Sequence, residues 1–364
     1  MKILITGGCG FIGSNYVMKQ VIRNHHTVLN LDKLTYAGNM ENLSNIIDDP
    51  NYSFVQGDIC DADCVTGAID QFQPEAIVHF AAESHVDRSI HAPDSFIQTN
   101  IIGTHTLLHA ACEVWVGCDN PPKNHLFHHV STDEVYGTLG LDEPAFSEDS
   151  PYAPNSPYAA SKAAADYLVR SYHHTYGLNV KTSNCSNNYG PYQFPEKLIP
   201  LVIVNALNGE SLPVYGDGSN IRDWLYVTDH CRGIDLIIDK GVVGETYNIG
   251  GNNERANIDV VKQICSRIDE VFDIRPELKK NFPNAPAAND KRTESLVRFV
   301  KDRPGHDWRY AIDATKSMTE LTYKPLESFD SGLGRTVDWM IDNETWWKSI
   351  LDGSYRNGIE TKYY

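Results

Sequence analysis

The segment KILIT at 2–6 leads directly into three glycines, Gly7, Gly10 and Gly13, and this junction limits the possible folds most strongly. A helical pattern follows, and the next apolar segment ends at the acidic residue Asp32. Glycines at these positions allow a tight turn and a close approach of the backbone to a pyrophosphate at the helix N-terminus. Asp32 can accept hydrogen bonds from ribose hydroxyls and would repel a 2′-phosphate. The order therefore predicts a dinucleotide site that takes NAD rather than NADP.

Short β-branched segments alternate with longer amphipathic ones through the first half of the chain. The segments KILITGG, TVLNLD, SFVQGD, AIVHFAA, LFHHVST and VKTSNCSN are almost continuously apolar, as strands buried on both faces are. This pattern predicts an α/β fold, a Rossmann-type doubly wound parallel sheet. GETYNIGG reads as one more strand returning to this sheet.

After about Tyr189 the sequence is punctuated by Pro and Gly, which indicates loops that carry a site rather than more sheet. We therefore expect a smaller, interleaved C-terminal substrate domain. The predicted cofactor domain covers 1–188 plus about 223–250, and the predicted substrate domain about 189–222 plus 251–364. The segment 336–351 has the apolar spacing of a terminal helix that packs its tryptophans on the body.

Composition narrows the possible partners and location. The net charge is −17, with 31 Lys and Arg against 48 Asp and Glu, so we expect no nucleic-acid binding. No apolar run approaches the roughly 20 residues of a membrane span, and the chain opens on a strand-like segment, which predicts a cytoplasmic protein without membrane attachment. The cysteines show no C-x-x-C pair, and adjacent histidines such as His128 and His129 point to different faces, so no metal site is predicted.

Two segments carry groups suited to proton transfer. Thr132, Asp133 and Glu134 follow the end of a predicted strand, and Tyr158 and Lys162 lie four residues apart at the start of a predicted helix. Tyr and Lys at this spacing share one helix face, where an ammonium and a nicotinamide cation would lower the pKa of Tyr158. Such pairs are also common in purely structural roles, and two acids after a strand also occur as a capping pair. The predicted glycine site favours the catalytic interpretation.

The motifs GGCGFIGSN, AAESHVDRSI, STDEVYG, YAASKAAAD, NNYGPYQFPEKLIP, RDWLYVTDH and DRPGHDWRYAID together resemble those of the dTDP-glucose 4,6-dehydratases, which are extended short-chain dehydrogenases/reductases. The resemblance runs from the first strand to about residue 325. It implies that Thr132, Tyr158 and Lys162 oxidise the sugar at C4. Glu134 would then remove the C5 proton while Asp133 protonates the departing C6 hydroxyl, after which hydride returns to C6 and NAD is regenerated. Asp133 must then have its pKa raised by burial or by the neighbouring carboxylate, while Glu134 stays ionised.

The same resemblance implies the contact residues. For the cofactor they are Gly7, Gly10, Phe11, Ile12, Gly13, Asp32, Lys33, Leu34, Thr35, Asp58, Ile59, Ala81, Ala82, Ser84, Thr99, Tyr158, Lys162 and Asn188. For the substrate dTDP-glucose they are Ser84, Thr132, Asn187, Lys197, Leu198, Pro213, Tyr215, Arg222, Asn257, Arg303 and His306. Asp58 is expected near the adenine, with a helix N-cap as its other interpretation.

A homodimer is also implied, through helices near residues 96–116 and 157–177, whose apolar stripes could equally cover the sheet. The expected product would feed the biosynthesis of deoxysugars such as rhamnose. Three other functions stay open: a UDP- or CDP-glucose 4,6-dehydratase, a UDP-hexose 4-epimerase and a non-catalytic NAD-sensing regulator. Asp133 and Glu134 speak against the epimerase, and the Tyr158–Lys162 pair speaks against the regulator.

Overall fold

The computed structural model describes residues 1–117, 125–302 and 305–353. Its main sheet has seven strands in the order β10-β6-β5-β4-β1-β2-β3, and all neighbours are parallel. The strands are β1 (Lys2–Thr6), β2 (Thr27–Asp32), β3 (Tyr52–Gln56), β4 (Ala76–His79), β5 (Leu126–Thr132), β6 (Val180–Cys185) and β10 (Thr246–Ile249). Six of the seven lie within segments predicted as strands, and β3 begins one residue before its segment. The predicted fold class is therefore confirmed.

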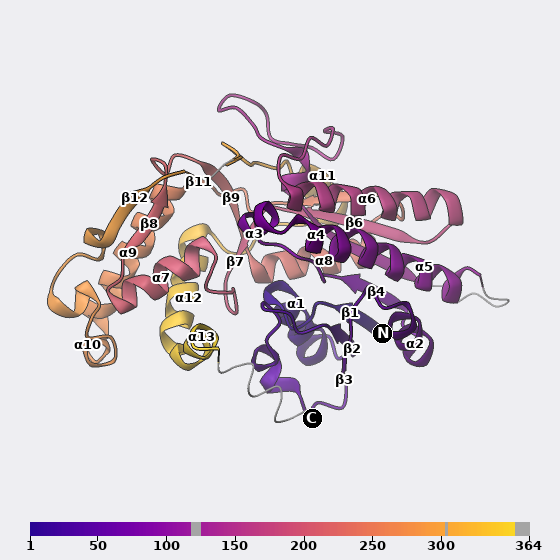
Figure 1. The fold of residues 1–364 in the computed structure, drawn as a ribbon, viewed down its shortest axis with the longest axis horizontal. Coiled ribbons are helices and arrows are strands. Elements are labelled where there is room, and N and C mark those ends of the chain that lie inside the picture. Colours follow the sequence, from indigo (N-terminus) through magenta and orange to yellow (C-terminus); the bar gives the residue numbers. More distant parts are fainter. Residues whose placement is uncertain (118–124, 303–304, 354–364) are drawn as a thin grey trace.

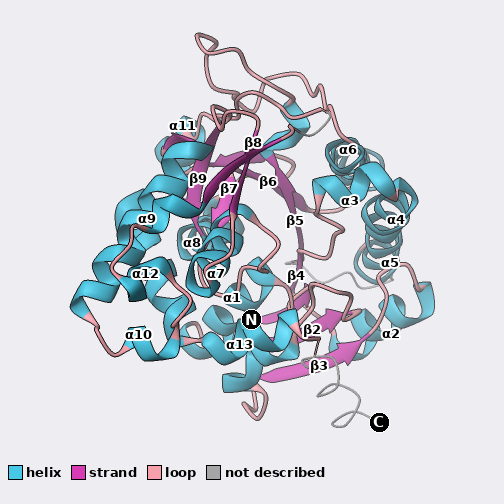
Figure 2. Ribbon diagram, turned by 60° about the vertical axis from the view of Figure 1, so that its left-hand side comes forward, coloured by secondary structure: helices cyan, strands magenta, loops and turns pink. Residues whose placement is uncertain are grey.

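Helices cover both faces of this sheet, as the almost continuous apolar character of the strands requires (Figure 2). Leu4, Ile77 and Phe127 face the helices α2 (Ala62–Phe72), α5 (Thr104–Trp115) and α6 (Pro157–Tyr176). Residues next to them in the strands, such as Ile5 and Val78, face the opposite layer. That layer contains α1 (Phe11–Met18), η1 (Lys19–Arg23), η2 (Met40–Ile46), α8 (Val227–Lys240) and α11 (Thr315–Leu321).

The strand order reverses between β1 and β4, where successive connections leave toward opposite sides. In doubly wound sheets, ligands bind in the crevice beyond the carboxyl ends of the strands at such a point. Short helical segments follow β4 and β5 in the chain: α3 (Val86–His91), α4 (Pro93–Phe96) and η3 (Ile97–Gly103) after β4, and η4 (Asp133–Tyr136) directly after β5. The topology therefore brings the glycine turn and the Thr132 segment to the same edge.

A second lobe lies beside the main sheet and has its own apolar core (Figure 1). Its strands are β7 (Asn187–Tyr189), β8 (Leu212–Tyr215), β9 (Ile221–Tyr226), β11 (Glu254–Ala256) and β12 (Val297–Val300), arranged as the sheets β11-β9-β7 and β12-β8. Its helices are α7 (Leu198–Asn208), α9 (Asn257–Ile274), α10 (Leu278–Asn281), η5 (Pro286–Asn289), η6 (Thr293–Leu296), α12 (Phe329–Asp342) and α13 (Glu344–Leu351).

Two expectations for this part of the chain were wrong. LPVY and IRDWLY, in the region predicted as loops, form β8 and β9. β8 accepts Pro213 because a two-stranded sheet has only edge strands. The single terminal helix predicted at 336–351 is two helices, separated at Asn343. Trp346 and Trp347 are nevertheless buried, as expected, and the Trp346 indole donates to Asn42 Oδ1 at 2.8 Å. This bond ties the end of the second lobe to η2 in the first half.

In the described residues, no helix combines the length and apolar character needed to cross a bilayer.

Candidate active site

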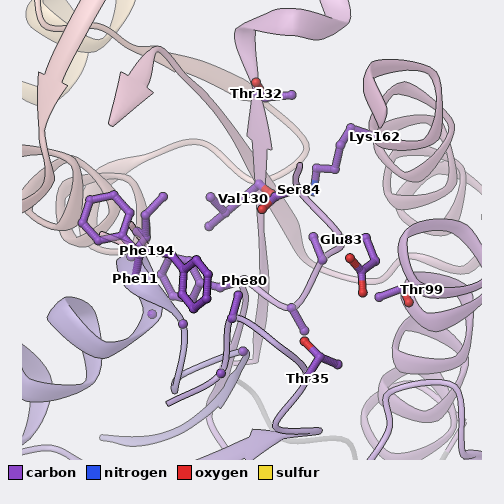
Figure 3. A pocket seen from close by; sticks show the side chains of 18 of the residues that line it. Phe11, Thr35, Phe80, Glu83, Ser84, Thr99, Val130, Thr132, Lys162 and Phe194 are labelled. Carbon is purple, nitrogen blue, oxygen red and sulfur yellow. Dashed lines mark hydrogen bonds between the residues drawn. The ribbon is translucent and has the colours of Figure 1, made fainter. Parts of the chain in front are cut away.

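A cavity of about 460 Å³ opens at the carboxyl ends of β1, β2, β4 and β5. Most residues predicted to bind the cofactor line it, together with all five predicted catalytic residues. Figure 3 shows Thr132 and Lys162 at one end of the view and Thr35 at the other, with Phe11, Phe80 and Phe194 on one side and Glu83 and Thr99 on the opposite side. One pocket thus joins the predicted cofactor site and the predicted catalytic residues.

The glycine turn leaves no room for side chains. Gly7 has φ +73°, and a Cβ there would lie 2.6 Å from the backbone nitrogen of Ala81. A Cβ on Gly13 would lie 2.2 Å from the carbonyl oxygen of Gly7. The turn therefore presents bare backbone at the N-terminus of α1, an arrangement that fits a bound pyrophosphate.

Asp32 ends β2 and lines the cavity as predicted. Its two carboxylate oxygens accept from the backbone N–H groups of Cys9 and Leu34 at 2.9 and 2.8 Å. Burial raises the pKa of Asp32, and these two hydrogen bonds counteract the rise. A carboxylate fixed in this way retains lone pairs for ribose hydroxyls. Nearby, Asp58 pairs with Lys33 at 2.6 Å, and Asp61, not Asp58, caps α2.

Asp133 and Glu134 begin η4, for which Thr132 is the N-cap: Thr132 Oγ1 accepts from the Glu134 N–H at 3.3 Å. Asp133 is only 1% exposed, whereas Glu134 is half-buried. Burial raises the pKa of Asp133 well above its usual value, and the charges of Glu134 and Asp223 add to the rise, which Arg222 opposes. The physical requirement stated for Asp133 as an acid is met.

Tyr158 and Lys162 project from the first turns of α6, which begins at Pro157 after the N-cap Ser156. Lys162 is 4% exposed and donates to the Val130 carbonyl of β5 at 2.8 Å. A lowered pKa was expected for Tyr158, but the groups of the protein, taken without a cofactor, raise it. Burial, followed by the charge of Glu134, raises this pKa well above the usual value, and the hydrogen bond with Thr132 opposes the rise.

The predicted substrate residues divide between two places. Ser84, Asn187 and Lys197 line the cavity, and Lys197 Nζ donates to the Ser84 carbonyl at 3.1 Å. Seven predicted contacts of cofactor or substrate do not line it: Leu34, Leu198, Pro213, Tyr215, Arg222, Asn257 and His306. Arg303 lies outside the described residues.

Several of these residues gather in the second lobe, around β8 and β9. The rings of Tyr215 and His306 meet edge to face with centroids 6.3 Å apart. Arg222 donates to the carbonyls of Ile221 and Asp307 at 2.7 and 2.9 Å, and its guanidinium lies 4.3 Å from the Tyr310 ring centroid. Because the charge of Arg222 acts on the pKa of Asp133, this group adjoins the catalytic end of the cavity.

The model of a protein family described as GDP-mannose 4,6 dehydratase matches residues 4–336. The chain belongs to this 4,6-dehydratase family. Among the family's similar members is the dTDP-glucose 4,6-dehydratase of Neisseria meningitidis serogroup B (strain MC58), which is 55% identical over 359 residues, covering 98% of this chain and 97% of the relative. The resemblance predicted from the motifs is confirmed.

Two solved structures have the same enzyme name and contain NAD. The dTDP-glucose 4,6-dehydratase of Streptomyces venezuelae superposes with a TM-score of 0.83 at 45% identity, covering 96% of this chain and 100% of that one. The enzyme of Bacillus anthracis str. Ames superposes with a TM-score of 0.82 at 44% identity, covering 96% and 99%.

Some cavity residues of this 4,6-dehydratase were not singled out from the sequence. Tyr36 donates to Glu196 Oε1 at 3.0 Å, and the Arg88 guanidinium lies 3.5 Å from the Tyr36 ring centroid. Glu83 and Phe194 also line the cavity. For Glu83, Arg88, Phe194 and Glu196 the signal lay within the segments AAESHVDRSI and NNYGPYQFPEKLIP, from which other positions were predicted as contacts. Tyr36 lies outside both segments.

Proposed function

We propose that this chain is an NAD-dependent nucleotide-sugar 4,6-dehydratase, which converts dTDP-glucose to dTDP-4-keto-6-deoxyglucose and water. The observation that carries the proposal is the position of Asp133 and Glu134, which directly follow Thr132 in one cavity with Tyr158 and Lys162. A dehydration needs this acid and base in addition to the groups that oxidise the sugar. Relatives of the same name at about half identity support the dTDP-glucose assignment.

Oxidation at C4 is assigned to Thr132, Tyr158 and Lys162. Thr132 and Tyr158 line the same cavity, and Thr132 acts to lower the pKa of Tyr158, so both can hold the C4 hydroxyl while the Tyr158 phenolate takes its proton. When bound, NAD supplies the hydride acceptor for C4, the later hydride donor for C6, and a cationic ring that favours the phenolate. The Lys162 ammonium favours the phenolate from the protein side.

Elimination is assigned to the two acids. A C4 ketone makes the C5 proton acidic, and Glu134 removes it as a carboxylate. Asp133, buried and with a raised pKa, stays protonated and donates to the leaving C6 hydroxyl, which departs as water. The adjacent acids thus perform opposite proton transfers.

Substrate binding is assigned to cations and aromatic groups, most of them in the second lobe. Lys197 and Arg222, with Arg303, would hold the diphosphate and ribose. Pro213 and Tyr215 would form a wall for the base, and the 43% exposure of Tyr215 is compatible with stacking on this ring. Ser84, Asn187, Asn257 and His306 complete the proposed contacts.

The cofactor and substrate are proposed to bind different parts of the interleaved chain, 1–188 plus about 223–250 and about 189–222 plus 251–364. Two separate apolar cores support this division, although Leu321 and Tyr323 pack into the first core. We further propose that the enzyme acts in the cytoplasm, where its product supplies deoxysugars such as rhamnose. The described cysteines are all free thiols, as a reducing compartment favours.

A homodimer through α5 and α6 belongs to the same proposal. The inner faces of these helices cover the sheet. On the outer side, Tyr167 of α6 and Ile97 and Ile102 of η3 are 57%, 50% and 41% exposed, so apolar surface remains for a second copy.

The direct test is incubation of the purified protein with dTDP-glucose, without added NAD, followed by mass spectrometry of the sugar nucleotide. Loss of one water supports the dehydratase and shows that NAD is retained through purification. Parallel reactions with UDP-glucose and CDP-glucose test the choice of nucleotide. An unchanged mass in every reaction, with NAD supplied, contradicts the proposal.

The elimination step has its own test. The double variant Asp133→Asn with Glu134→Gln should still oxidise C4, seen as reduced nicotinamide absorbance in one turnover, but should not release water. Normal turnover by this variant would show that other groups perform the elimination.

A further inference from the structure

Behind Lys162 lies a buried polar cluster that the proposed mechanism does not use. Asp166 follows Lys162 by four residues on α6, and both side chains point at β5. Asp166 Oδ1 lies 3.0 Å from His129 Nε2, and Ser131 Oγ donates to Asp166 Oδ2 at 2.9 Å. Lys162 meets the carbonyl of Val130 between these two β5 residues; Figure 3 shows Lys162 extending from its helix toward Val130. Tyr158, Lys162 and Asp166 therefore form one line along the helix face.

The cluster has a specific charge state. Asp166 is 6% exposed, and burial raises its pKa to about 6, with Lys162, Ser131 and Tyr152 opposing the rise. Burial lowers the pKa of His129 well below its usual value, so His129 is neutral and its Nε2–H donates to the carboxylate. Near neutral pH the buried cluster thus contains one anion, Asp166, and one cation, Lys162.

Lys162 needs such a partner. Burial lowers the pKa of this lysine, and the charge of Asp166 is the first of the causes that raise it again. An ammonium at 4% exposure without a nearby anion would tend to lose its proton. We propose that Asp166 is a positioning residue that supplies the counter-charge of Lys162 and so keeps the ammonium available to Tyr158.

Other titratable groups face Lys162 and Asp166, but these groups do not add a second negative charge near pH 7. They are His129 of β5, His79 of β4 with its ring 5.4 Å from that of His129, Tyr136 of η4, Tyr152 before α6, Cys185 of β6 and Tyr158 itself. Burial lowers the pKa of His79 and raises that of Tyr136, Tyr152 and Cys185, so these groups are neutral near pH 7. Asp166 is therefore the anion that balances Lys162.

The test is the pH profile of kcat for dTDP-glucose in the variant Asp166→Asn. Asn keeps the size of Asp and one acceptor oxygen but removes the charge, so the pKa of Lys162 should fall. The alkaline limb of the profile should move to lower pH by about one unit or more. An unmoved limb in a folded, active variant overturns the inference.

Two matched variants separate charge from packing. Ser131→Ala removes a hydrogen bond to the same carboxylate but leaves it ionised at alkaline pH, so its alkaline limb should coincide with that of the wild type. Asp166→Glu keeps the charge and should restore the limb toward the wild-type position. A shift in Ser131→Ala as large as that in Asp166→Asn would assign the effect to packing and overturn the proposal.

A reciprocal measurement needs no activity. Carbon-13 NMR of labelled aspartate carboxyls gives the titration midpoint of Asp166, identified by its displacement in Ser131→Ala. In Lys162→Met that midpoint should rise above the wild-type value because the opposing cation is lost. An equal midpoint in both proteins overturns the inference even if Asp166→Asn does not fold. This inference rests on the proposed function; a wild type inactive on dTDP-glucose would contradict that function but leave the NMR test of the charge pair intact.

Discussion

Asp133 and Glu134 are neighbours in sequence, but the fold gives them different surroundings. Asp133 faces inward at the start of η4 and is almost completely buried, whereas Glu134 is half-buried toward the cavity. Adjacent residues of a tight helical turn point in different directions, so one acid loses solvent while the other keeps part of it. The proposed division into proton donor and proton acceptor follows from this difference in burial.

The raised pKa of Asp133 predicts a cost in stability that depends on pH. The folded protein binds a proton that the unfolded chain loses above pH about 4, so the cost of burying Asp133 grows as pH rises and levels off above the folded pKa. Asp133→Asn should therefore raise the thermal midpoint at pH 8 by roughly 2 °C or more, while abolishing turnover. Unfolding scans from pH 4 to pH 9 check this. A difference that is constant with pH would contradict the raised pKa.

Arg222 gives a second prediction at this scale. Arg222→Ala should raise KM for dTDP-glucose about tenfold or more, with a smaller change in kcat, because a forked contact to the ligand is lost. The thermal midpoint should also fall, because Arg222 donates to the partly buried carbonyls of Ile221 and Asp307. Arg298→Ala is the control, since Arg298 is exposed on β12 and also donates to backbone carbonyls. An unchanged KM in Arg222→Ala would remove this residue from the proposed site.

Individual residue types were predictable where the chemistry requires a particular side chain, as for Asp32, Thr132 and Lys162, which all line the cavity. The pKa of Tyr158 was not, because it depends on burial and on Glu134, which only the folded chain brings close. The same limit applies to Asp166: the sequence shows its helical spacing from Lys162 but not the side chains of β5 that receive it.

At the scale of elements, the glycine turn between β1 and α1 depends on close contact between backbone atoms. A methyl group on Gly13 would clash with the backbone of Gly7. Both residues belong to the same tight turn, so the clash cannot be relieved by a side-chain movement. The seven main strands were predictable because burial on both faces makes their sequences apolar. The short strands β8 and β9 were not, because their pairing partners, β12 for β8 and both β7 and β11 for β9, are separated from them in the chain and leave no local signal.

Gly13→Ala should destabilise the protein by about 1–3 kcal/mol and lower its content of bound NAD. Gly67→Ala in α2 is the matched control: a Cβ at Gly67 would have nothing within 4 Å, so the change should stabilise the helix by about 0.5–1 kcal/mol and leave the NAD content unchanged. Chemical denaturation and assay of NAD released from purified protein measure both effects. Equal NAD content in the two variants would contradict the assigned role of the turn.

At the scale of the whole molecule, the two lobes are joined through the Trp346–Asn42 hydrogen bond. Asn42 also donates to the carbonyl of Cys9 in the glycine turn at 2.9 Å. The last described helix, α13, is therefore linked by two hydrogen bonds to the predicted cofactor site. The sequence predicted the interleaving of the lobes from the late strand β10, but it gave no sign of this link.

Trp346→Phe should destabilise the protein by about 1 kcal/mol or more, because Asn42 Oδ1 stays buried without its donor. It should also weaken NAD retention. Trp347→Phe is the control, since Trp347 donates to Met340 within its own lobe at 2.9 Å. We expect similar losses of stability but a loss of NAD only in Trp346→Phe. Equal NAD content in both would show that the link does not reach the cofactor site.

The late position of α8 and β10 in the sequence also affects how the chain folds during translation. The first six strands of the main sheet are complete by Cys185, but α8, which covers one face, ends at Lys240, and β10, which covers the β6 edge, ends at Ile249. While the ribosome adds the intervening residues, the nascent chain must expose an apolar sheet face and an unpaired strand edge. Such surfaces aggregate readily, so we expect chaperones to bind this chain during translation until α8 has emerged.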